Sequence, residues 1–333
     1  MKLEEKFKKA VELINQSNSI LITTHTRPDG DACGSVVAMC EVLAGLGKDT
    51  KLLFLSEIPE WYEFLLTEKV QILGEDVQLQ DLAAGRFVEF DMIVIVDTNS
   101  HSQLSTFAEF LKQNERPVLV IDHHVTSDGL GNVELIDKTA AATGLIVFDL
   151  LKYAKWPISE RTATALFVTA ATDTGWFQFS NTDSRVHRIC AELIDAGANP
   201  MQVYHDLYQN FSHQRFKLMA TMFNTLELHF EGRFATQYLT QEDFKRTGAK
   251  YNDTENLIDE CRRISSVEAA ALFVELADGM VKVSLRSSGE VDVRKIATKF
   301  SGGGHTAAAG VHMTGPIEKA KELILAEMAK CFK

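Results

Sequence analysis

Residues 117–124 read Pro-Val-Leu-Val-Ile-Asp-His-His, so a continuous apolar run ends directly in three polar side chains, Asp122, His123 and His124. Uninterrupted Val, Ile and Leu residues are typical of a strand that is buried on both faces of a parallel sheet. In open parallel sheets, ligands bind beyond the carboxyl ends of the strands. This stretch therefore predicts a functional site at one edge of a parallel sheet.

Three further apolar runs, at residues 19–24, 92–96 and 165–171, also lead into acids or histidine. The run at 165–171 is compatible with either a strand or a helix. The polar residues that follow these runs are His25, Asp29, Asp31, Asp97 and Asp173. If all four runs end at the same edge, these side chains gather there together with Asp122, His123 and His124. Such a set holds more ligands than one metal ion uses.

The first half of the chain alternates apolar strands with segments of helical periodicity. Strands are expected near 19–24, 51–55, 92–97, 117–122 and 132–136, and helices near 2–16, 33–46, 103–113, 140–154 and 158–172. This alternation predicts an α/β fold, with a doubly wound, mainly parallel sheet in an N-terminal domain. The segment from Gly30 to Ser35 opens a helix directly after the first strand, but it lacks the G-x-G-x-x-G pattern of dinucleotide-binding domains.

The second half has a different pattern. Residues 183–226 are helical, with a helix stop and a new start at 196–200, and short strands follow at 234–239, 268–275 and 280–285. The last two strands are joined by Leu-Ala-Asp-Gly, which favours a hairpin. We therefore expect an N-terminal domain at 1–190, a helical linker at 191–229 and a smaller C-terminal α/β domain at 230–333.

Charge and composition restrict the function. The 333 residues carry a net charge of −12, and residues 231–333 hold fifteen basic and fifteen acidic residues, so the whole excess lies in 1–230. An acidic domain repels long polyanions, which argues against a duplex nucleic acid as partner. No stretch reaches the ~18 apolar residues of a membrane span, and the N-terminal segment is not typical of a signal peptide. Five cysteines without C-x-x-C spacing indicate reduced thiols and a cytoplasmic location.

The ligand types indicate which metal is expected. Carboxylates with a minority of histidines suit Mn²⁺ or Mg²⁺, whereas thiolate-rich sites suit zinc. Two ions ~3.5–4 Å apart that share a carboxylate can generate a hydroxide and stabilise the attacking and leaving oxygens at phosphorus. Taken alone, Asp29-Gly30 could be a turn, and Asp173 a turn or a helix cap. The same arrangement, an apolar run that leads into an acid or a histidine, occurs four times in the chain. This recurrence favours the metal site over isolated turns or caps.

These residues resemble the motifs of a known family. The four motifs are His25-x3-Asp29-Gly-Asp31, Asp97-Thr, Asp122-His-His124 and Thr172-Asp173-Thr-Gly, and they are similar to those of the DHH phosphoesterase superfamily. Residues 301–310, Ser-Gly-Gly-Gly-His-Thr-Ala-Ala-Ala-Gly, resemble the signature of the DHH-associated domain. The layout is most similar to the branch of nanoRNases, or oligoribonucleases, that also act as 3′-phosphoadenosine 5′-phosphate phosphatases.

The resemblance implies two divalent metal ions, with Mn²⁺ favoured and Mg²⁺ or Co²⁺ as alternatives. One ion would be held by His25, Asp29 and Asp97. The other would be held by Asp31, Asp97, His123 and Asp173, with Asp97 bridging the two. Two catalytic residues complete the site: Asp122 would orient a histidine, and His124 would lie on the phosphate side.

In the C-terminal domain, the resemblance assigns nucleotide binding to Arg286, Gly303, Gly304 and His305, and also to Arg262. A tight structural turn is the alternative explanation for the three glycines. The implied function is hydrolysis of short oligoribonucleotides to nucleoside 5′-monophosphates by a two-metal hydroxide mechanism, together with dephosphorylation of 3′-phosphoadenosine 5′-phosphate to AMP. The expected partners are short single-stranded RNA or DNA and mononucleotides, and a homodimer is left open.

Other functions fit parts of the pattern. The nearest is a phosphodiesterase for pApA or a cyclic dinucleotide. A RecJ-like exonuclease would be expected to have a further binding domain and a more basic groove. An inorganic pyrophosphatase would lack the glycine-rich segment. A non-catalytic nucleotide-binding protein would be favoured by a missing ligand, but every motif position is filled.

Overall fold

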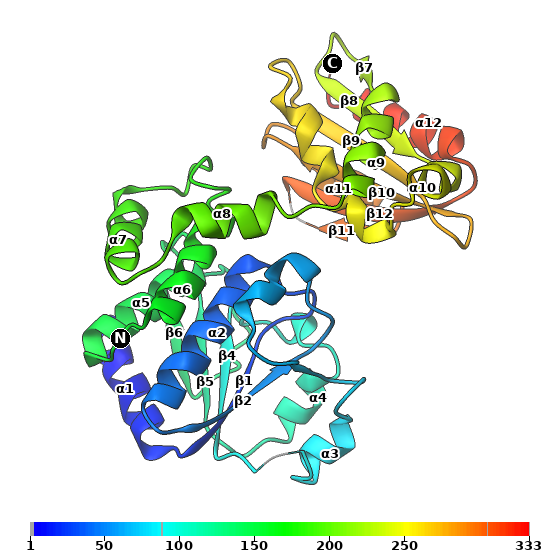
Figure 1. Cartoon of the computed structure of the whole chain (residues 1–333). Coiled ribbons are helices and arrows are strands. Elements are labelled where there is room, and N and C mark those ends of the chain that lie inside the picture. Colours follow the sequence, from blue (N-terminus) through cyan, green and yellow to red (C-terminus); the bar gives the residue numbers. More distant parts are fainter. Residues whose placement is uncertain (1–2, 88, 305, 333) are drawn as a thin grey trace. The chain divides into compact units, whose positions relative to one another are not determined.

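The protein has two compact units, Met1–Asn210 and Phe211–Lys333, each built around its own sheet. The computed structural model describes residues 3–87, 89–304 and 306–332 (Figure 1). The expected α/β class is confirmed in both units. Within these ranges, no helix has both the length and the apolar character that crossing a membrane requires.

The first unit contains a six-stranded sheet in the order β3-β2-β1-β4-β5-β6, and every neighbouring pair is parallel. The strands are β1 (Ser19–Thr23), β2 (Asp49–Phe54), β3 (Gln71–Ile72), β4 (Met92–Val96), β5 (Val118–Asp122) and β6 (Val133–Ile136). All five residues of β4 and of β5 are buried. The continuous apolar runs in the sequence therefore mark central strands that are covered on both faces.

Helices cover both faces of this sheet, which confirms the doubly wound arrangement. One face packs against α1 (Leu3–Gln16), α2 (Gly30–Gly45), α5 (Thr143–Ala154) and α6 (Glu160–Asp173). The other face packs against α3 (Leu79–Ala83) and α4 (Phe107–Lys112). Side chains alternate along β1, because Ile20 and Ile22 enter the first core and Leu21 enters the second.

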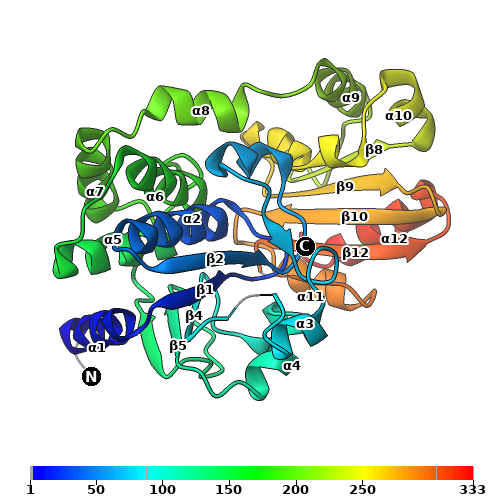
Figure 2. The same ribbon diagram turned by 60° about the horizontal axis from the view of Figure 1, so that its bottom comes forward.

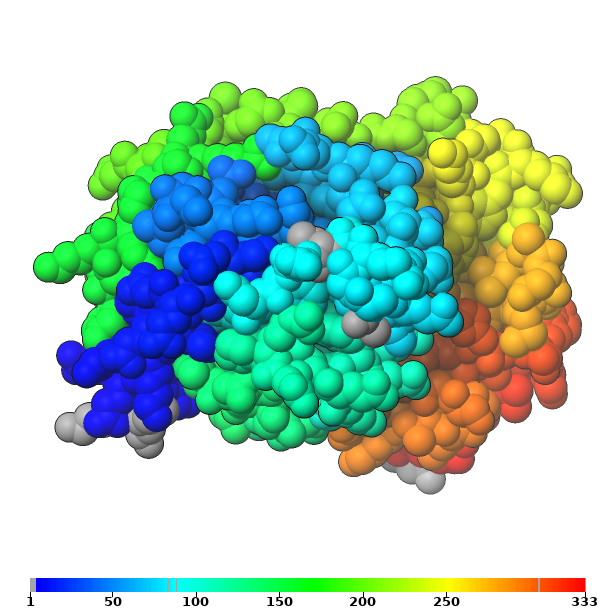
Figure 3. Space-filling model, turned by 90° about the horizontal axis from the view of Figure 1, so that it is seen from below, coloured from blue at the N-terminus to red at the C-terminus, as the bar shows by residue number. Residues whose placement is uncertain are grey.

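Residues 165–171, for which both a strand and a helix were open, lie in the helix expected at 158–172. This helix, α6, is buried on almost all sides, so it lacks the polar stripe that would have distinguished it from a strand. Two other segments differ from the expectation. The helix expected at 103–113 is shorter: a 3₁₀ turn at His101–Gln103 precedes α4, which begins at Phe107. The segment between β2 and β4, for which no element was predicted, contains β3, α3 and a 3₁₀ helix at Glu60–Leu65. Figure 3 shows this segment at the surface, in light blue and cyan.

The helical region after Asp183 is confirmed. It contains α7 (Ser184–Asp195), α8 (Pro200–Tyr208) and α9 (His213–Asn224), and Asn199 caps α8 where the sequence predicts a new helix start. The two units divide between Asn210 and Phe211, so α7 and α8 belong to the first unit and α9 to the second. The boundaries at 190/191 and 229/230 stay predictions.

The second unit contains a mixed sheet in the order β11-β12-β10-β9-β8-β7. Figure 2 shows four of these strands, β8, β9, β10 and β12. The strands are β7 (Glu227–His229), β8 (Phe234–Leu239), β9 (Ala269–Glu275), β10 (Met280–Ser287), β11 (Gly303–Gly304) and β12 (Ala308–Thr314). The expected β9–β10 hairpin is confirmed, and β8–β9 is the parallel pair. The helices are α9, α10 (Gln241–Thr247), α11 (Val293–Thr298) and α12 (Ile317–Met328), and a 3₁₀ helix spans Leu257–Arg263.

Candidate metal centre

The candidate site lies at the carboxyl ends of β1, β4 and β5, which are neighbours in the sheet. The chain runs from β1 to β2 on one side and later returns to β4 on the other side of β1. Open α/β sheets typically bind ligands at such a reversal of strand order. His25 follows β1, Asp97 follows β4, and Asp122 ends β5. His123 and His124 come directly after β5.

Two acids of the site belong to the start of α2. Asp29 is the N-cap, and its Oδ1 accepts the backbone N–H groups of Asp31 and Ala32, both at 3.1 Å. Asp29-Gly30, for which a turn was the alternative explanation, thus forms the start of a helix, and the second oxygen of Asp29 has no part in the cap. Asp31, the second residue of α2, is fully buried, and Ser35 donates to its Oδ1 at 3.2 Å.

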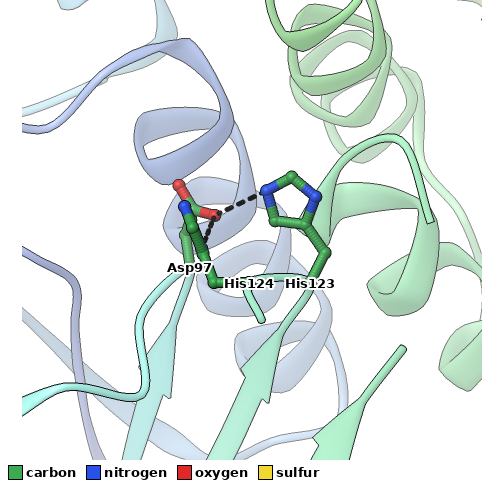
Figure 4. A group of neighbouring side chains, drawn as sticks. All are labelled: Asp97, His123 and His124. Atoms are coloured by element: carbon green, nitrogen blue, oxygen red, sulfur yellow. Dashed lines mark ion pairs between the residues drawn. The ribbon is translucent and has the colours of Figure 1, made fainter. Parts of the chain in front are cut away.

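Asp97 lies at the centre of the site. Its Oδ2 is 3.4 Å from His25 Nε2, and its Oδ1 is 3.7 Å from His123 Nε2 and 3.8 Å from His124 Nδ1. Figure 4 shows the Asp97 carboxylate joined to both His123 and His124. The residue is 2% exposed, and its φ of 62° is in the left-handed region that few non-glycine residues adopt. A costly backbone conformation therefore points this carboxylate into the centre.

Hydrogen bonds fix two of the histidine rings. His25 Nδ1 lies 2.9 Å from the carbonyl oxygen of Thr26, and His123 Nδ1 lies 3.1 Å from the carbonyl oxygen of Ala140. Because carbonyl oxygens only accept, both rings carry their proton on Nδ1. The Nε2 atoms face carboxylates: His25 Nε2 is 3.4 Å from Asp97 Oδ2, and His123 Nε2 is 3.3 Å from Asp173 Oδ2. Metal-bound histidines are typically oriented by such a bond from the other nitrogen.

Asp122 and His124 form a separate pair. His124 Nδ1 donates to Asp122 Oδ1 at 2.7 Å, and the same oxygen accepts the backbone N–H of His124. Asp122 is fully buried, whereas the His124 side chain is 42% exposed. The hydrogen bond to Asp122 raises the pKa of His124. Asp122 therefore favours the protonated form of a ring that is open to solvent.

The electrostatics of the centre favour a cation. Burial raises the pKa of Asp31, Asp97 and Asp173, and for Asp97 the neighbouring carboxylates of Asp31, Asp29 and Asp173 raise it further. Carboxylates that are buried side by side are stable as anions only when positive charge lies between them. Oxygen ligands with two or three imidazole nitrogens suit Mn²⁺ or Mg²⁺. The donor set thus fits hard divalent cations.

The ligand atoms fall into groups in which every atom lies within 4.8 Å of the others. Among the described residues these groups are His25, Asp29 and Asp97; Asp31, His123 and Asp173; and Asp97, His123 and His124. These groups contain seven of the eight side chains predicted for this edge, and the eighth, Asp122, is hydrogen-bonded to His124. Asp173 reaches it from the C-terminal end of a helix rather than from a strand.

The second unit gathers the arginines predicted for substrate binding. Arg262 Nη1 is 2.7 Å from Asp259 Oδ1, and Arg286 Nε is 3.9 Å from Asp259 Oδ2. Gly303 and Gly304 form β11, which is separated from β10 and its Arg286 by β12. His305 lies outside the described residues.

Reasoning from the sequence missed one contributor to the centre, the N-terminus of α5. The backbone N–H groups of Thr143 and Gly144 donate to Asp31 at 2.6 and 3.0 Å, and the Thr143 hydroxyl donates to Asp97 Oδ1 at 2.9 Å. The only available signal was a Thr-Gly pair at the start of a predicted helix. These contacts join residues up to 113 positions apart, so no local pattern encodes them.

The fold and the candidate centre define an α/β protein whose donor set suits divalent cations, and comparison with known proteins identifies its family. Residues 19–172 match the N-terminal domain of the DHH family, and residues 231–333 match the DHHA1 domain. The chain belongs to the DHH family and carries a DHHA1 domain in its second half.

A relative from Thermus thermophilus, named bifunctional oligoribonuclease and PAP phosphatase NrnA, is 30% identical over 98% of this chain and 92% of its own length. Among solved structures, an exopolyphosphatase-related protein from Bacteroides fragilis has a TM-score of 0.92 at 23% identity and covers 99% of this chain and 97% of its own. The exonuclease RecJ bound to manganese has a TM-score of 0.57 at 16% identity, with 99% and 94% coverage. Both structures have the same fold as this chain.

Proposed function

We propose that this protein hydrolyses short oligoribonucleotides to nucleoside 5′-monophosphates and removes the 3′-phosphate from 3′-phosphoadenosine 5′-phosphate. The observation that carries the proposal is the position of Asp97, whose two oxygens face different sets of ligands. Support comes from the name of the Thermus thermophilus relative, which is similar over nearly the full length of both chains.

The proposal assigns two divalent ions to the centre. One would be held by His25, Asp29 and Asp97, and the other by Asp31, Asp97, His123 and Asp173. Mn²⁺ is our first choice, with Mg²⁺ and Co²⁺ as alternatives, because the donor set is rich in oxygen and RecJ has been solved with manganese. Two such ions would supply an activated water nucleophile and offset the charge that develops on the oxygens around phosphorus.

The protein's own residues have distinct tasks in this proposal. The buried acids and the Nδ1-protonated rings of His25 and His123 hold the ligand atoms in place. His124 stands partly exposed, with Nδ1 bound to Asp122, so Nε2 is the atom that can donate to a phosphate or leaving oxygen. Asp122 keeps that ring oriented and favours its protonated form.

We assign substrate binding to the second unit, through Arg262, Arg286, Gly303, Gly304 and His305. Arginine presents a planar fork that suits phosphate oxygens, and glycine lets a ligand approach the backbone closely. The net charge of −12 opposes a long polyanion, so short single strands and mononucleotides are the proposed substrates.

A substrate panel with Mn²⁺ tests the proposal. It contains labelled RNAs of two to five nucleotides, a 24-nucleotide RNA, pApA, cyclic di-AMP and 3′-phosphoadenosine 5′-phosphate. We expect the shortest RNAs to be cleaved fastest, with release of 5′-monophosphates, and the bisphosphate to lose its 3′-phosphate. A strong preference for pApA or cyclic di-AMP would instead assign the protein to signal turnover. No hydrolysis of any substrate would contradict an enzymatic function.

A further inference from the structure

Residues 137–144, here called the clamp segment, follow β6 and include the first two residues of α5. They contact several parts of the candidate metal centre. Ala140 accepts the Nδ1–H of His123 through its carbonyl oxygen, and the N–H groups of Thr143 and Gly144 bind the two oxygens of Asp31. The Thr143 hydroxyl binds Asp97 Oδ1. One short segment thus holds the central acid and two ligands of the second proposed ion.

Thr143 has a specific position in this segment. The residue is fully buried, and its hydroxyl has Asp97 as its hydrogen-bond acceptor. A hydroxyl that donates to one lone pair of a carboxylate restricts the rotation of that carboxylate. The other lone pairs stay free, and the bond thereby sets the direction in which they point. Since Asp97 also has a strained backbone, this bond helps to hold the carboxylate in its unusual orientation.

The clamp segment is itself anchored at both ends. Arg185 of α7 joins Asp137 Oδ2 at 2.9 Å to Asp149 Oδ2 of α5 at 2.6 Å. Gly144 lets α5 approach α6 closely, because a Cβ there would lie 1.9 Å from Thr169 Oγ1. Asn181 donates to the carbonyl oxygens of both Ala141 and Asp173, at 3.3 and 3.1 Å. These bonds make the segment a fixed element rather than a free loop.

We propose that Thr143 is a positioning residue of the metal centre, and that it acts by orienting Asp97 through its hydroxyl while the clamp segment holds Asp31 and His123. This inference rests on the proposed two-metal function, but it concerns metal affinity and so can be tested without substrate. Residues that orient metal ligands typically change metal affinity by about 10- to 100-fold when they are replaced.

The test compares Thr143→Val, which keeps the shape and removes the hydroxyl, with Thr143→Ser, which keeps the hydroxyl. Thr162→Val is the matched control, because Thr162 is a buried threonine of the same unit whose hydroxyl meets Ser159 instead of the centre. Mn²⁺ binding to the chelator-treated full chain is measured by calorimetry. Thermal unfolding is measured for each variant to verify that it is folded.

We expect Thr143→Val to bind Mn²⁺ roughly 10- to 100-fold more weakly, and Thr143→Ser and Thr162→Val to bind it as the wild type does. Unchanged Mn²⁺ affinity in Thr143→Val would overturn the role of the hydroxyl. An equal loss of Mn²⁺ affinity in Thr143→Val and Thr143→Ser would overturn it as well. If Thr143→Val does not fold, Arg185→Gln tests the clamp segment, and unchanged affinity there overturns the proposal.

The two proposals fail in distinguishable ways. A wild-type protein that binds Mn²⁺ in this manner but leaves every nucleotide intact would contradict the proposed function and support the inference. A wild-type protein that does not bind Mn²⁺ would overturn both.

Discussion

Asp97 combines three unfavourable features at the scale of a single residue. Its backbone is left-handed, its side chain is 2% exposed, and three other carboxylates raise its pKa. A folded protein tolerates such a group when a ligand offsets the cost or when the group is protonated. The residue therefore connects the stability of the protein to its metal content and to pH.

Asp97→Asn should stabilise the metal-free protein at neutral pH. The pKa of Asp97 is raised on folding, so its stabilising contribution is fully present below the unfolded value of ~3.9 and is lost as the pH rises through the folded pKa. Asparagine cannot ionise and tolerates a left-handed backbone. We expect the advantage of the variant in urea unfolding with chelator to be larger at pH 7 than at pH 4.5. An advantage that is independent of pH would contradict this account.

At this scale the sequence predicted which acids and histidines gather at the sheet edge, but not the groups that hold these side chains in place. Acids and histidines at the ends of apolar runs can be recognised in the sequence as candidates for one site. The reason is that the carboxyl ends of parallel strands meet at one edge of the sheet. Thr143 and Asn181 carry no comparable signal, since threonine and asparagine are common at helix starts and in loops. Their roles depend on contacts across the fold.

At the scale of elements, close helix packing positions the acids. α2, α5 and α6 meet through Gly34 and Gly144, and a Cβ at Gly34 would lie 2.5 Å from both the Ala165 carbonyl oxygen and Thr169 Cγ2. This approach places the start of α2, with Asp29 and Asp31, beside the start of α5. Helix interiors rarely contain glycine without such a packing reason.

Gly34→Ala should destabilise the protein by about 1–3 kcal/mol, because the added methyl group must displace backbone atoms of α6. Gly45→Ala is the matched control at the end of the same helix, where an added Cβ would meet no atom within 4 Å. The control should be neutral or slightly stabilising. Urea unfolding of both variants measures the difference, and equal stabilities would argue against close packing at Gly34.

Element type was predicted well where burial is uniform or where periodicity is clear. The strands β1, β2, β4, β5 and β6 of the first sheet and the β9–β10 hairpin are examples. The apolar run at 165–171 was ambiguous, because a helix packed on nearly all sides has the same composition as a buried strand. The short strands β3, β7 and β11 have two or three residues each, too few for a periodic pattern.

At the scale of the whole molecule, the two units divide the proposed tasks. The first contains the candidate metal centre, and the second contains Arg286, which is partly exposed beside Asp259. Binding of metal and binding of nucleotide should therefore be separable by mutation.

Arg286→Ala should raise the KM for a dinucleotide by roughly 10-fold or more, because a charge-assisted bond to phosphate is lost, while Mn²⁺ affinity stays unchanged. Arg263→Ala is the control, since that side chain is 80% exposed and pairs with Glu260. Steady-state kinetics and Mn²⁺ titration of both variants provide the check. An unaltered KM in Arg286→Ala would contradict the assignment of substrate binding to the second unit.

The most direct test of the central claim combines metal binding and turnover in one titration. Chelator-treated protein is titrated with Mn²⁺ while bound metal and hydrolysis of a dinucleotide are measured, for the wild type and for Asp97→Asn. We predict two Mn²⁺ per wild-type chain with hydrolysis that requires them, and a loss of turnover of roughly a thousandfold or more in the variant. Hydrolysis without metal, or near-normal turnover in Asp97→Asn, would contradict a two-metal centre built around Asp97.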